Sequence, residues 1–168
     1  IRKQWAHELD EKFNIPTIVL DEKSYRQALN DGIASPFDRK EVIITSTHFA
    51  SRYRDEIRLI GWDLAVIDEA HKLKNPTTEL TKCFFELSNL FIRKIIMTGT
   101  PVANRPYDLW ALIYFLDGGV SLGSDFEKFK IEYFPVSKSC PDTESASYIK
   151  IFLSISYDGN EFEATYIY

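Results

Sequence analysis

Four short runs of β-branched and aliphatic residues, separated by helical patterns, constrain the fold of this chain more than any other feature. The runs lack polar alternation, which is typical of strands buried on both faces of a parallel sheet. Between them, apolar residues recur at helical spacing, as in the segment that follows the helix-start signal Asn75–Thr78. This alternation predicts right-handed crossovers and a three-layer α/β domain. The runs are Thr17–Leu20, Val42–Thr45, Leu64–Ile67 and Lys94–Met97.

The pattern changes towards the C-terminal end of the sequence. Pro106–Leu116 is apolar nearly all round, which predicts a buried helix, and Asp125–Phe134 predicts a further short helix. Pro135–Ser147 is polar and rich in turn residues, and strict alternation around Asp158-Gly159-Asn160 then favours a β-hairpin. We therefore expect one α/β domain over residues 1–134, and a polar linker with a possible hairpin over residues 135–168.

Composition adds bounds rather than a function. A chain of 168 residues holds one core, and its net charge of −5 argues against a uniformly basic coat without excluding a local basic groove. Cys83 and Cys140 have neither disulfide-framework nor zinc spacing, and no apolar run approaches the ~20 residues of a membrane helix. We expect an intracellular protein: cytoplasmic if bacterial, nuclear if eukaryotic. Because the sequence opens at Ile1 inside a helical pattern, we also expect it to be an excerpt of a longer chain.

The acid pair Asp68-Glu69 comes directly after the run Leu64–Ile67. Ligands of open α/β sheets bind at the carboxyl ends of the strands, so both carboxylates are placed towards a ligand crevice. An Asp there can hold Mg²⁺ beside nucleotide phosphates, and a neighbouring Glu can deprotonate an attacking water. The alternative is that the two acids only cap the following helix.

Three further segments are candidates for binding. Thr98-Gly99-Thr100-Pro101 ends the last run at the sheet edge where Asp68 and His71 are expected, although such a string is by itself more often a turn. Thr45 and Ser46 end the second run and can donate to phosphates, or alternatively cap the next helix. In the first helix, Gln4 and Trp5 are candidates as well, with Trp5 alternatively belonging to the core.

Taken in order, these segments resemble the Swi/Snf-type ATPases of helicase superfamily two. The resemblance covers about Ile1 to Phe134, and the ordered set is far more specific than any single string. Its segments are Gln4-Trp5…Glu8-Leu9, Ile43-Ile-Thr-Ser46, the DEAH-type string Asp68-Glu-Ala-His71 continuing to Asn75, Met97-Thr-Gly-Thr-Pro-Val-Ala-Asn104, Asp108–Leu116 and Phe126–Phe129.

The resemblance implies a RecA-like first lobe with an incomplete, mostly parallel sheet. It implies ATP and Mg²⁺ as cofactors, with Asp68 holding the metal and Glu69 activating water. His71 and Thr98–Thr100 then couple the ATP state to a nucleic-acid groove contacted by Gln4, Trp5, Thr45 and Ser46. In such motors a second lobe supplies arginines, and the protein translocates along double-stranded DNA.

The sequence departs from that family in two respects. The Gly-rich phosphate loop with its Lys is missing from the 168 residues, so we expect it upstream of Ile1, and the second lobe is missing too. We therefore expect an ATP hydrolase as the full-length protein and an inactive fragment in isolation. The alternative is a catalytically inactive lobe that serves as a binding scaffold. A small-molecule α/β enzyme has little support, because no nucleophile–base arrangement is present.

Overall fold

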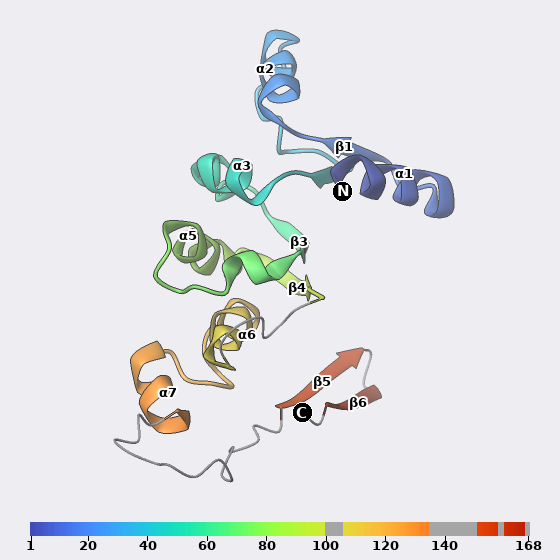
Figure 1. Cartoon of the computed structure of the whole chain (residues 1–168). Helices are drawn as coiled ribbons and strands as arrows, with labels where there is room; N and C mark the ends of the chain where they lie inside the picture. The colour runs from blue at the N-terminus through green and yellow to red at the C-terminus, as the bar shows by residue number, and fades with distance from the viewer. Residues whose placement is uncertain (100–105, 135–150, 158–159, 167–168) are drawn as a thin grey trace. The chain divides into compact units, whose positions relative to one another are not determined.

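A computed structural model describes residues 1–99, 106–134, 151–157 and 160–166 of the chain. The chain divides into two compact units, Ile1–Phe134 and Pro135–Tyr168. Helices and strands alternate along the first unit (Figure 1). Its elements are α1 Arg2–Phe13, β1 Thr17–Val19, α2 Glu22–Asn30, β2 Val42–Ile44, α3 Thr47–Arg52, α4 Arg54–Ile57, β3 Trp62–Asp68, the 3-10 helix η1 Ala70–Leu73, α5 Glu79–Ser88, β4 Phe91–Met97, the 3-10 helix η2 Pro106–Asp108, α6 Leu109–Asp117 and α7 Phe126–Tyr133.

The strands of the first unit form two parallel pairs. β1 pairs with β2, and β3 pairs with β4 in a register that sets Asp68 opposite Met97. In each pair a helix connects the two parallel strands, as the alternation of strand and helix predicts. The α/β class and the parallel pairing expected from the sequence are thus confirmed. Among the described residues, the two pairs are separate sheets.

The two faces of the β3–β4 pair differ in burial. Ile67 is 6% exposed, on the face that α5 and α6 approach. Leu64, Val66 and Ile95 lie on the other face and are each 47% exposed. The sequence predicted burial on both faces, but the helices described around this pair cover one of them. Within the described residues, the apolar side chains of these strands are therefore buried on one face and about half exposed on the other.

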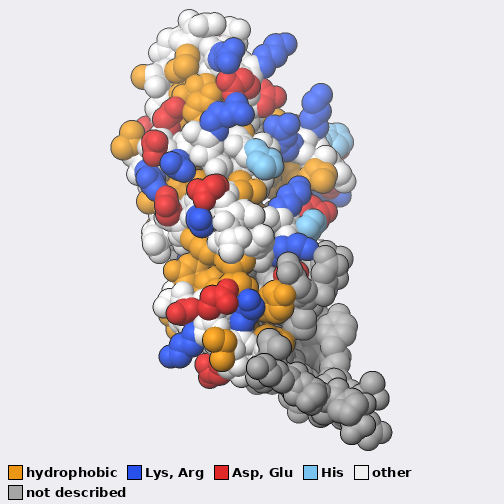
Figure 2. Space-filling view, turned by 60° about the vertical axis from the view of Figure 1, so that its left-hand side comes forward, with side chains coloured by type: hydrophobic (Ala, Val, Ile, Leu, Met, Phe, Trp, Pro, Cys, Tyr) orange, Lys and Arg blue, Asp and Glu red, His pale blue; other side chains and the backbone are white. Residues whose placement is uncertain are grey.

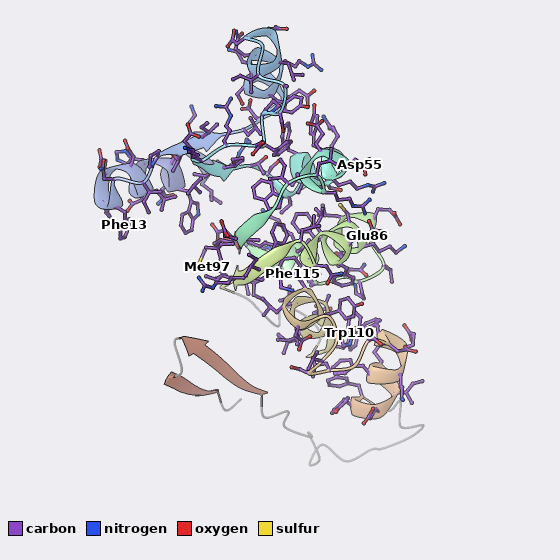
Figure 3. All side chains as sticks on the ribbon, turned by 180° about the vertical axis from the view of Figure 1, so that it is seen from behind. Phe13, Asp55, Glu86, Met97, Trp110 and Phe115 are labelled. Carbon is purple, nitrogen blue, oxygen red and sulfur yellow. The ribbon has the colours of Figure 1, made fainter. Side chains whose placement is uncertain are left out.

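The core of the first unit lies between α5, α6 and β4. Leu87, Leu112 and Phe115 are almost completely buried there, and the rings of Phe84 and Phe115 lie 6.3 Å apart. Phe115 lies between α6 and β4 (Figure 3). The Lys94 ammonium of β4 lies 5.9 Å from its ring centre. The predicted burial of the nearly all-apolar helix is confirmed, because five of the nine residues of α6 are buried. A helix without a polar face is stable only when it is enclosed in this way.

Helix α7 is attached to α6 through aromatic rings. The Trp110 ring stacks on Tyr114 at 4.8 Å and lies 5.2 Å from Phe126, between α6 and α7 in Figure 3. The indole N–H of Trp110 donates to the Gly123 carbonyl at 3.2 Å, so its polar atom is satisfied. Asp125 begins α7 by accepting the Lys128 amide.

In the second unit, β5 (Ile151–Tyr157) and β6 (Asn160–Tyr166) pair antiparallel. The predicted hairpin strands are thereby confirmed, whereas Asp158 and Gly159 of the predicted turn lie outside the described residues. Across the part of the chain that the structure describes, none of the helices is both long and apolar enough to cross a membrane.

Candidate functional site

The candidate site lies where β3 and β4 end side by side. Because Asp68 pairs with Met97, the residues that follow each strand leave the sheet at the same edge. Glu69 follows Asp68, and Thr98 and Gly99 follow Met97. The structure therefore brings the acid pair together with Thr98 and Gly99 at the carboxyl ends of parallel strands, where ligands of open α/β sheets bind. Thr100 lies outside the described residues.

The carboxylate of Asp68 is fixed from two sides. Its Oδ1 accepts a hydrogen bond from the Glu69 amide at 2.9 Å, and its Oδ2 accepts one from the Trp5 indole Nε1–H at 2.9 Å. Asp68 and Trp5 are both half-buried. An ionised carboxylate accepts about four hydrogen bonds or metal contacts, so both oxygens keep accepting capacity in other directions.

Glu69 turns the chain out of the strand. Its φ of 54° and ψ of 46° place it in the left-handed region, at the residue before η1. The Glu69 Oε2 lies 3.1 Å from Nδ1 of His71, and these side chains are 42% and 35% exposed. The Glu69 side chain makes no capping hydrogen bond to η1, and the Asp68 carboxylate accepts only from the adjacent backbone amide within this turn. Helix capping, the alternative explanation of the acid pair, therefore accounts for little of its geometry.

The residues present fit a magnesium ion of the kind that nucleotides bring with them. Among the described residues, no group of three or more His, Cys, Asp or Glu side chains is arranged so that it could hold a metal ion by itself. Mg²⁺ in nucleotide sites instead uses one or two carboxylates together with phosphates and waters. Asp68, pre-oriented and still able to accept, meets that requirement.

The side chains of Gln4 and Trp5 have different surroundings although the two residues are adjacent in α1. Gln4 is exposed, together with its neighbours Arg2 and Lys3, whereas Trp5 directs its N–H to Asp68. Neither residue is among the buried residues of the core. The alternative that Trp5 is a core residue is therefore not supported. A contact between these residues and nucleic acid stays a prediction.

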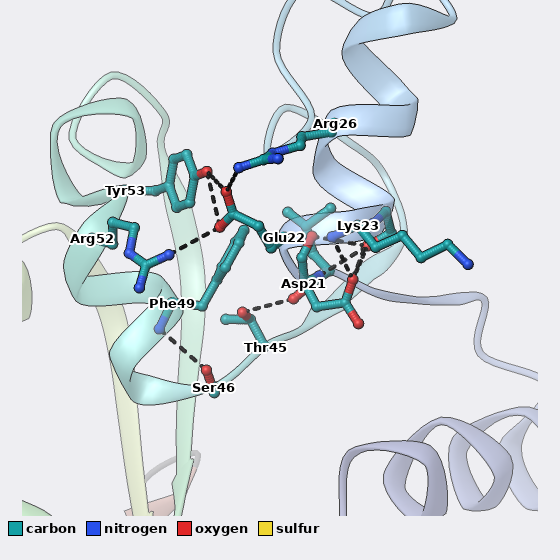
Figure 4. Close-up of polar contacts among 11 residues, drawn as sticks. Asp21, Glu22, Lys23, Arg26, Thr45, Ser46, Phe49, Arg52 and Tyr53 are labelled. Carbon is teal, nitrogen blue, oxygen red and sulfur yellow. Dashed lines mark hydrogen bonds and ion pairs between the residues drawn. The ribbon is translucent and has the colours of Figure 1, made fainter.

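The segment at the end of β2 is held by its own hydrogen bonds (Figure 4). Thr45 Oγ1 donates to the Leu20 carbonyl at 2.9 Å, and Ser46 Oγ accepts the Phe49 amide at 3.1 Å as the N-cap of α3. Capping, the alternative for Ser46, is therefore observed. The cap uses one lone pair of the Ser46 hydroxyl, whose proton can still be donated to a phosphate. A phosphate contact is therefore compatible with the cap and stays a prediction.

Helices α2 and α3 are tied together around Glu22. Its carboxylate accepts hydrogen bonds from Arg26, Arg52 and the Tyr53 hydroxyl, at 2.9, 3.1 and 3.2 Å (Figure 4). Burial, with Glu22 alongside, raises the pKa of the Tyr53 hydroxyl, so it stays protonated as a donor. This cluster holds α3, and with it Ser46, against α2.

Charge on the first unit is mixed rather than gathered in one block. On the face shown in Figure 2, Lys and Arg side chains are interspersed with acids, histidines and hydrophobic groups. A nucleic-acid contact on such a surface has to be local, in keeping with the net charge of −5.

Sequence reasoning did not find the bond between Trp5 and Asp68. The two residues are 63 positions apart, and no short-range pattern connects a helix face with a strand end at that distance. The bounds of α2 were not predicted either, although Asp21 and Ser24 form a capping box at its start, a signal that the sequence does contain.

An α/β unit with two carboxylates and a threonine at the carboxyl ends of adjacent parallel strands belongs to the class of proteins that bind ligands at that sheet edge. Comparison with known sequences then gives the family: the SNF2-related domain family matches residues 1–145, and the chain belongs to it.

Two curated relatives illustrate the similarity. The chain is 35% identical over 108 residues to the ISWI chromatin-remodeling complex ATPase ISW2 of Saccharomyces cerevisiae, which covers 63% of the chain and 9% of that protein. It is 34% identical over 142 residues to the DNA repair and recombination protein RAD54B of Gallus gallus, covering 82% of the chain and 14% of that protein. The chain thus spans a small part of the length of these relatives.

A solved structure is similar as well. The Sulfolobus solfataricus SWI2/SNF2 ATPase core in complex with dsDNA matches with a TM-score of 0.58 and 30% sequence identity, over 76% of this chain and 25% of that one. The similarity in sequence and in fold supports the RecA-like lobe that the resemblance implies.

Proposed function

We propose that this chain is part of the first RecA-like lobe of an ATP-dependent motor that translocates along double-stranded DNA and remodels complexes on it. The observation that carries the proposal is the placement of Asp68 and Glu69 at the sheet edge shared with Thr98. Membership of the SNF2-related family supports it, as do relatives described as a chromatin-remodeling ATPase and a DNA repair protein. The solved relative was captured with double-stranded DNA.

In this proposal the string Asp68-Glu69-Ala70-His71 acts as a DEAH-type motif. Bound Mg²⁺·ATP supplies the phosphoanhydride bond and the charge neutralisation that its cleavage needs. Asp68 holds the metal, directly or through water, and Glu69 orients the attacking water and accepts its proton. His71, in contact with Glu69 at 3.1 Å, and Thr98–Thr100 relay the state of the nucleotide to the nucleic-acid side.

The remaining parts of the proposal concern the whole protein. Residues 1–134 form part of lobe one, residues 135–168 form a linker and hairpin, and a second lobe supplies arginines that complete the site. Gln4, Trp5, Thr45 and Ser46 line the DNA side. The 168 residues contain no Gly-x-x-x-x-Gly-Lys element, so the chain on its own hydrolyses almost no ATP. A DNA substrate implies an intracellular site of action: the nucleus in a eukaryote and the cytoplasm in a bacterium.

The test is DNA-stimulated ATP hydrolysis by the full-length protein carrying Glu69→Gln. Loss of the proton acceptor should lower kcat by about 10²–10⁴-fold, the usual contribution of a general base. ATP binding should persist, because the amide preserves the size of the side chain.

The matched control is Glu132→Gln, which neutralises an exposed acid of α7 and should leave kcat unchanged. Wild-type turnover in Glu69→Gln would show that another group activates the water. A wild-type protein that binds DNA but does not hydrolyse ATP would favour the inactive scaffold instead.

A further inference from the structure

We propose that Trp5 is a positioning residue for the metal-binding acid: its indole N–H orients the Asp68 carboxylate for Mg²⁺, and it links α1 directly to the ATP site. The inference rests on the proposed function, in which Asp68 holds the ion. It deepens that function by assigning to Trp5, a candidate DNA-contacting residue, a second role at the metal site.

The Asp68 carboxylate is held at both of its oxygens. Its two oxygens each accept one hydrogen bond at 2.9 Å, Oδ1 from the Glu69 amide and Oδ2 from the Trp5 indole. The Glu69 amide belongs to the same turn and leaves the carboxylate free to rotate about one fixed point. The indole bond comes from a different element and fixes the second oxygen, so the plane of the carboxylate is determined.

The indole N–H is a suitable partner for a metal-binding carboxylate. An indole N–H donates and cannot accept, so it stabilises the carboxylate only as an acceptor. It also leaves lone pairs of Oδ2 available for a cation or its bound water. Partners of this kind orient the ligands of metal sites, and losing one typically costs about 10–100-fold in metal affinity or activity.

Helix α1 connects the bond at Asp68 with an exposed polar surface. This helix packs on β1 and β2, and its first turn exposes Arg2, Lys3 and Gln4. Trp5 follows immediately, so a polar, cationic turn and the indole bonded to Asp68 belong to one rigid segment. A displacement of α1 by a ligand on its exposed side changes the geometry at Asp68 through a single side chain.

The experiment compares Trp5→Phe with Trp62→Phe in the full-length protein. Both changes remove an indole N–H from a half-buried tryptophan. The Trp62 N–H donates to the Ile57 carbonyl at 2.9 Å rather than to an acid, which makes it the matched control. Binding of a fluorescent ATP analogue and DNA-stimulated hydrolysis are each measured as a function of Mg²⁺ concentration.

We expect Trp5→Phe to raise the half-saturating Mg²⁺ concentration about tenfold in both measurements. Nucleotide binding in excess chelator should stay as in wild type, because no metal is then involved. Trp62→Phe should leave the Mg²⁺ dependence unchanged. An unaltered Mg²⁺ dependence in Trp5→Phe, or an equal change in both variants, would overturn the inference. If Trp5→Phe does not fold, Trp5→Leu takes its place, because it removes the indole N–H as well and supplies no other donor.

A spectroscopic measurement keeps the positioning role apart from a packing role. In protein labelled with 5-fluorotryptophan, the Trp5 fluorine resonance, identified by its absence from the Trp5 variant, should shift when Mg²⁺ and a non-hydrolysable ATP analogue are added together. The Trp62 resonance should not shift. A Trp5 resonance indifferent to Mg²⁺ refutes the role of Trp5 even where hydrolysis is normal. Absence of Mg²⁺-dependent hydrolysis in wild type refutes the proposed function itself.

Discussion

At the scale of single residues, the backbone of Glu69 is the unusual feature of the candidate site. Two non-glycine residues of the described chain have positive φ, Asn14 at 52° and Glu69 at 54°. Asn tolerates this region because its short side chain bonds locally, whereas Glu gains no such compensation. The left-handed turn carries the chain from β3 into η1 and brings the Glu69 carboxylate to His71. The strain is thus located where the function is proposed to be.

This backbone strain predicts which of two variants without the carboxylate is the more stable. Glu69→Gly should be more stable than Glu69→Ala by about 1 kcal/mol, because glycine adopts positive φ without steric cost. Urea unfolding followed by circular dichroism measures the difference. At the exposed Asn89, whose φ is −73°, the same pair should reverse, with Ala at least as stable as Gly. The same ordering at both positions would contradict the account of Glu69.

The sequence was sufficient to predict where Asp68 and Thr98 lie but not what holds them. An apolar run that ends in an acid marks a strand end whatever the distant surroundings, because the signal is local. The orientation of the Asp68 carboxylate depends instead on Trp5, through a contact formed only by folding. The αL turn at Glu69 was equally hidden, because Glu is not a residue that signals positive φ.

At the scale of elements, the C-terminus of α6 is closed by a compact turn. Gly118 and Gly119 have φ of 68° and 93°, and the Asp117 carboxylate accepts the amides of Gly119 and Ser121 at 2.8 and 2.9 Å. Burial opposes ionisation of Asp117, but hydrogen bonding from the Ser121 side chain and from backbone amides of the turn outweighs it and lowers the pKa of its carboxyl group. The turn directs the chain back so that α7 packs on Trp110.

The two glycines of this turn should differ in their tolerance of substitution. A Cβ at Gly118 meets nothing within 4 Å, so Gly118→Ala carries only the cost of positive φ, about 1–2 kcal/mol. A Cβ at Gly119 lies 3.0 Å from backbone atoms of Gly123 and Ser124, which cannot move aside as a side chain can. Gly119→Ala should therefore lower the free energy of unfolding further, by roughly another 1–3 kcal/mol. Chemical denaturation of both variants tests this order, and equal costs would contradict it.

The starts of the strands also depend partly on local sequence and partly on tertiary contacts. The strands β1 and β2 start where the sequence predicted, whereas β3 and β4 begin earlier, at Trp62 and Phe91. These aromatic residues pair across the strands with ring centres 6.4 Å apart, an extension that depends on the partner strand. The half-exposed face of β3 and β4 likewise could not be predicted, because periodicity reports which residues are apolar rather than which element covers them.

At the scale of the whole molecule, charge limits how the proposed DNA partner can bind. The chain has a net charge of −5 and repels a polyanion at long range, so any affinity has to come from cations placed locally. The first turn of α1 offers such a place, since Arg2 and Lys3 are exposed beside Gln4. If this turn faces the phosphate backbone, each cation that contacts it releases about one condensed counterion on binding.

The salt dependence of duplex binding by the full-length protein tests this placement. Arg2→Ala should weaken binding regardless of DNA sequence and should reduce the slope of log K against log salt by about one, because one phosphate contact is lost. Lys128→Ala, at an exposed position of α7, removes the same charge from the protein and should leave the slope unchanged. Fluorescence anisotropy of a labelled duplex between about 50 and 200 mM salt resolves such a difference. Equal slopes in the two variants would place the DNA elsewhere than on α1, since the loss of net charge alone is the same in both.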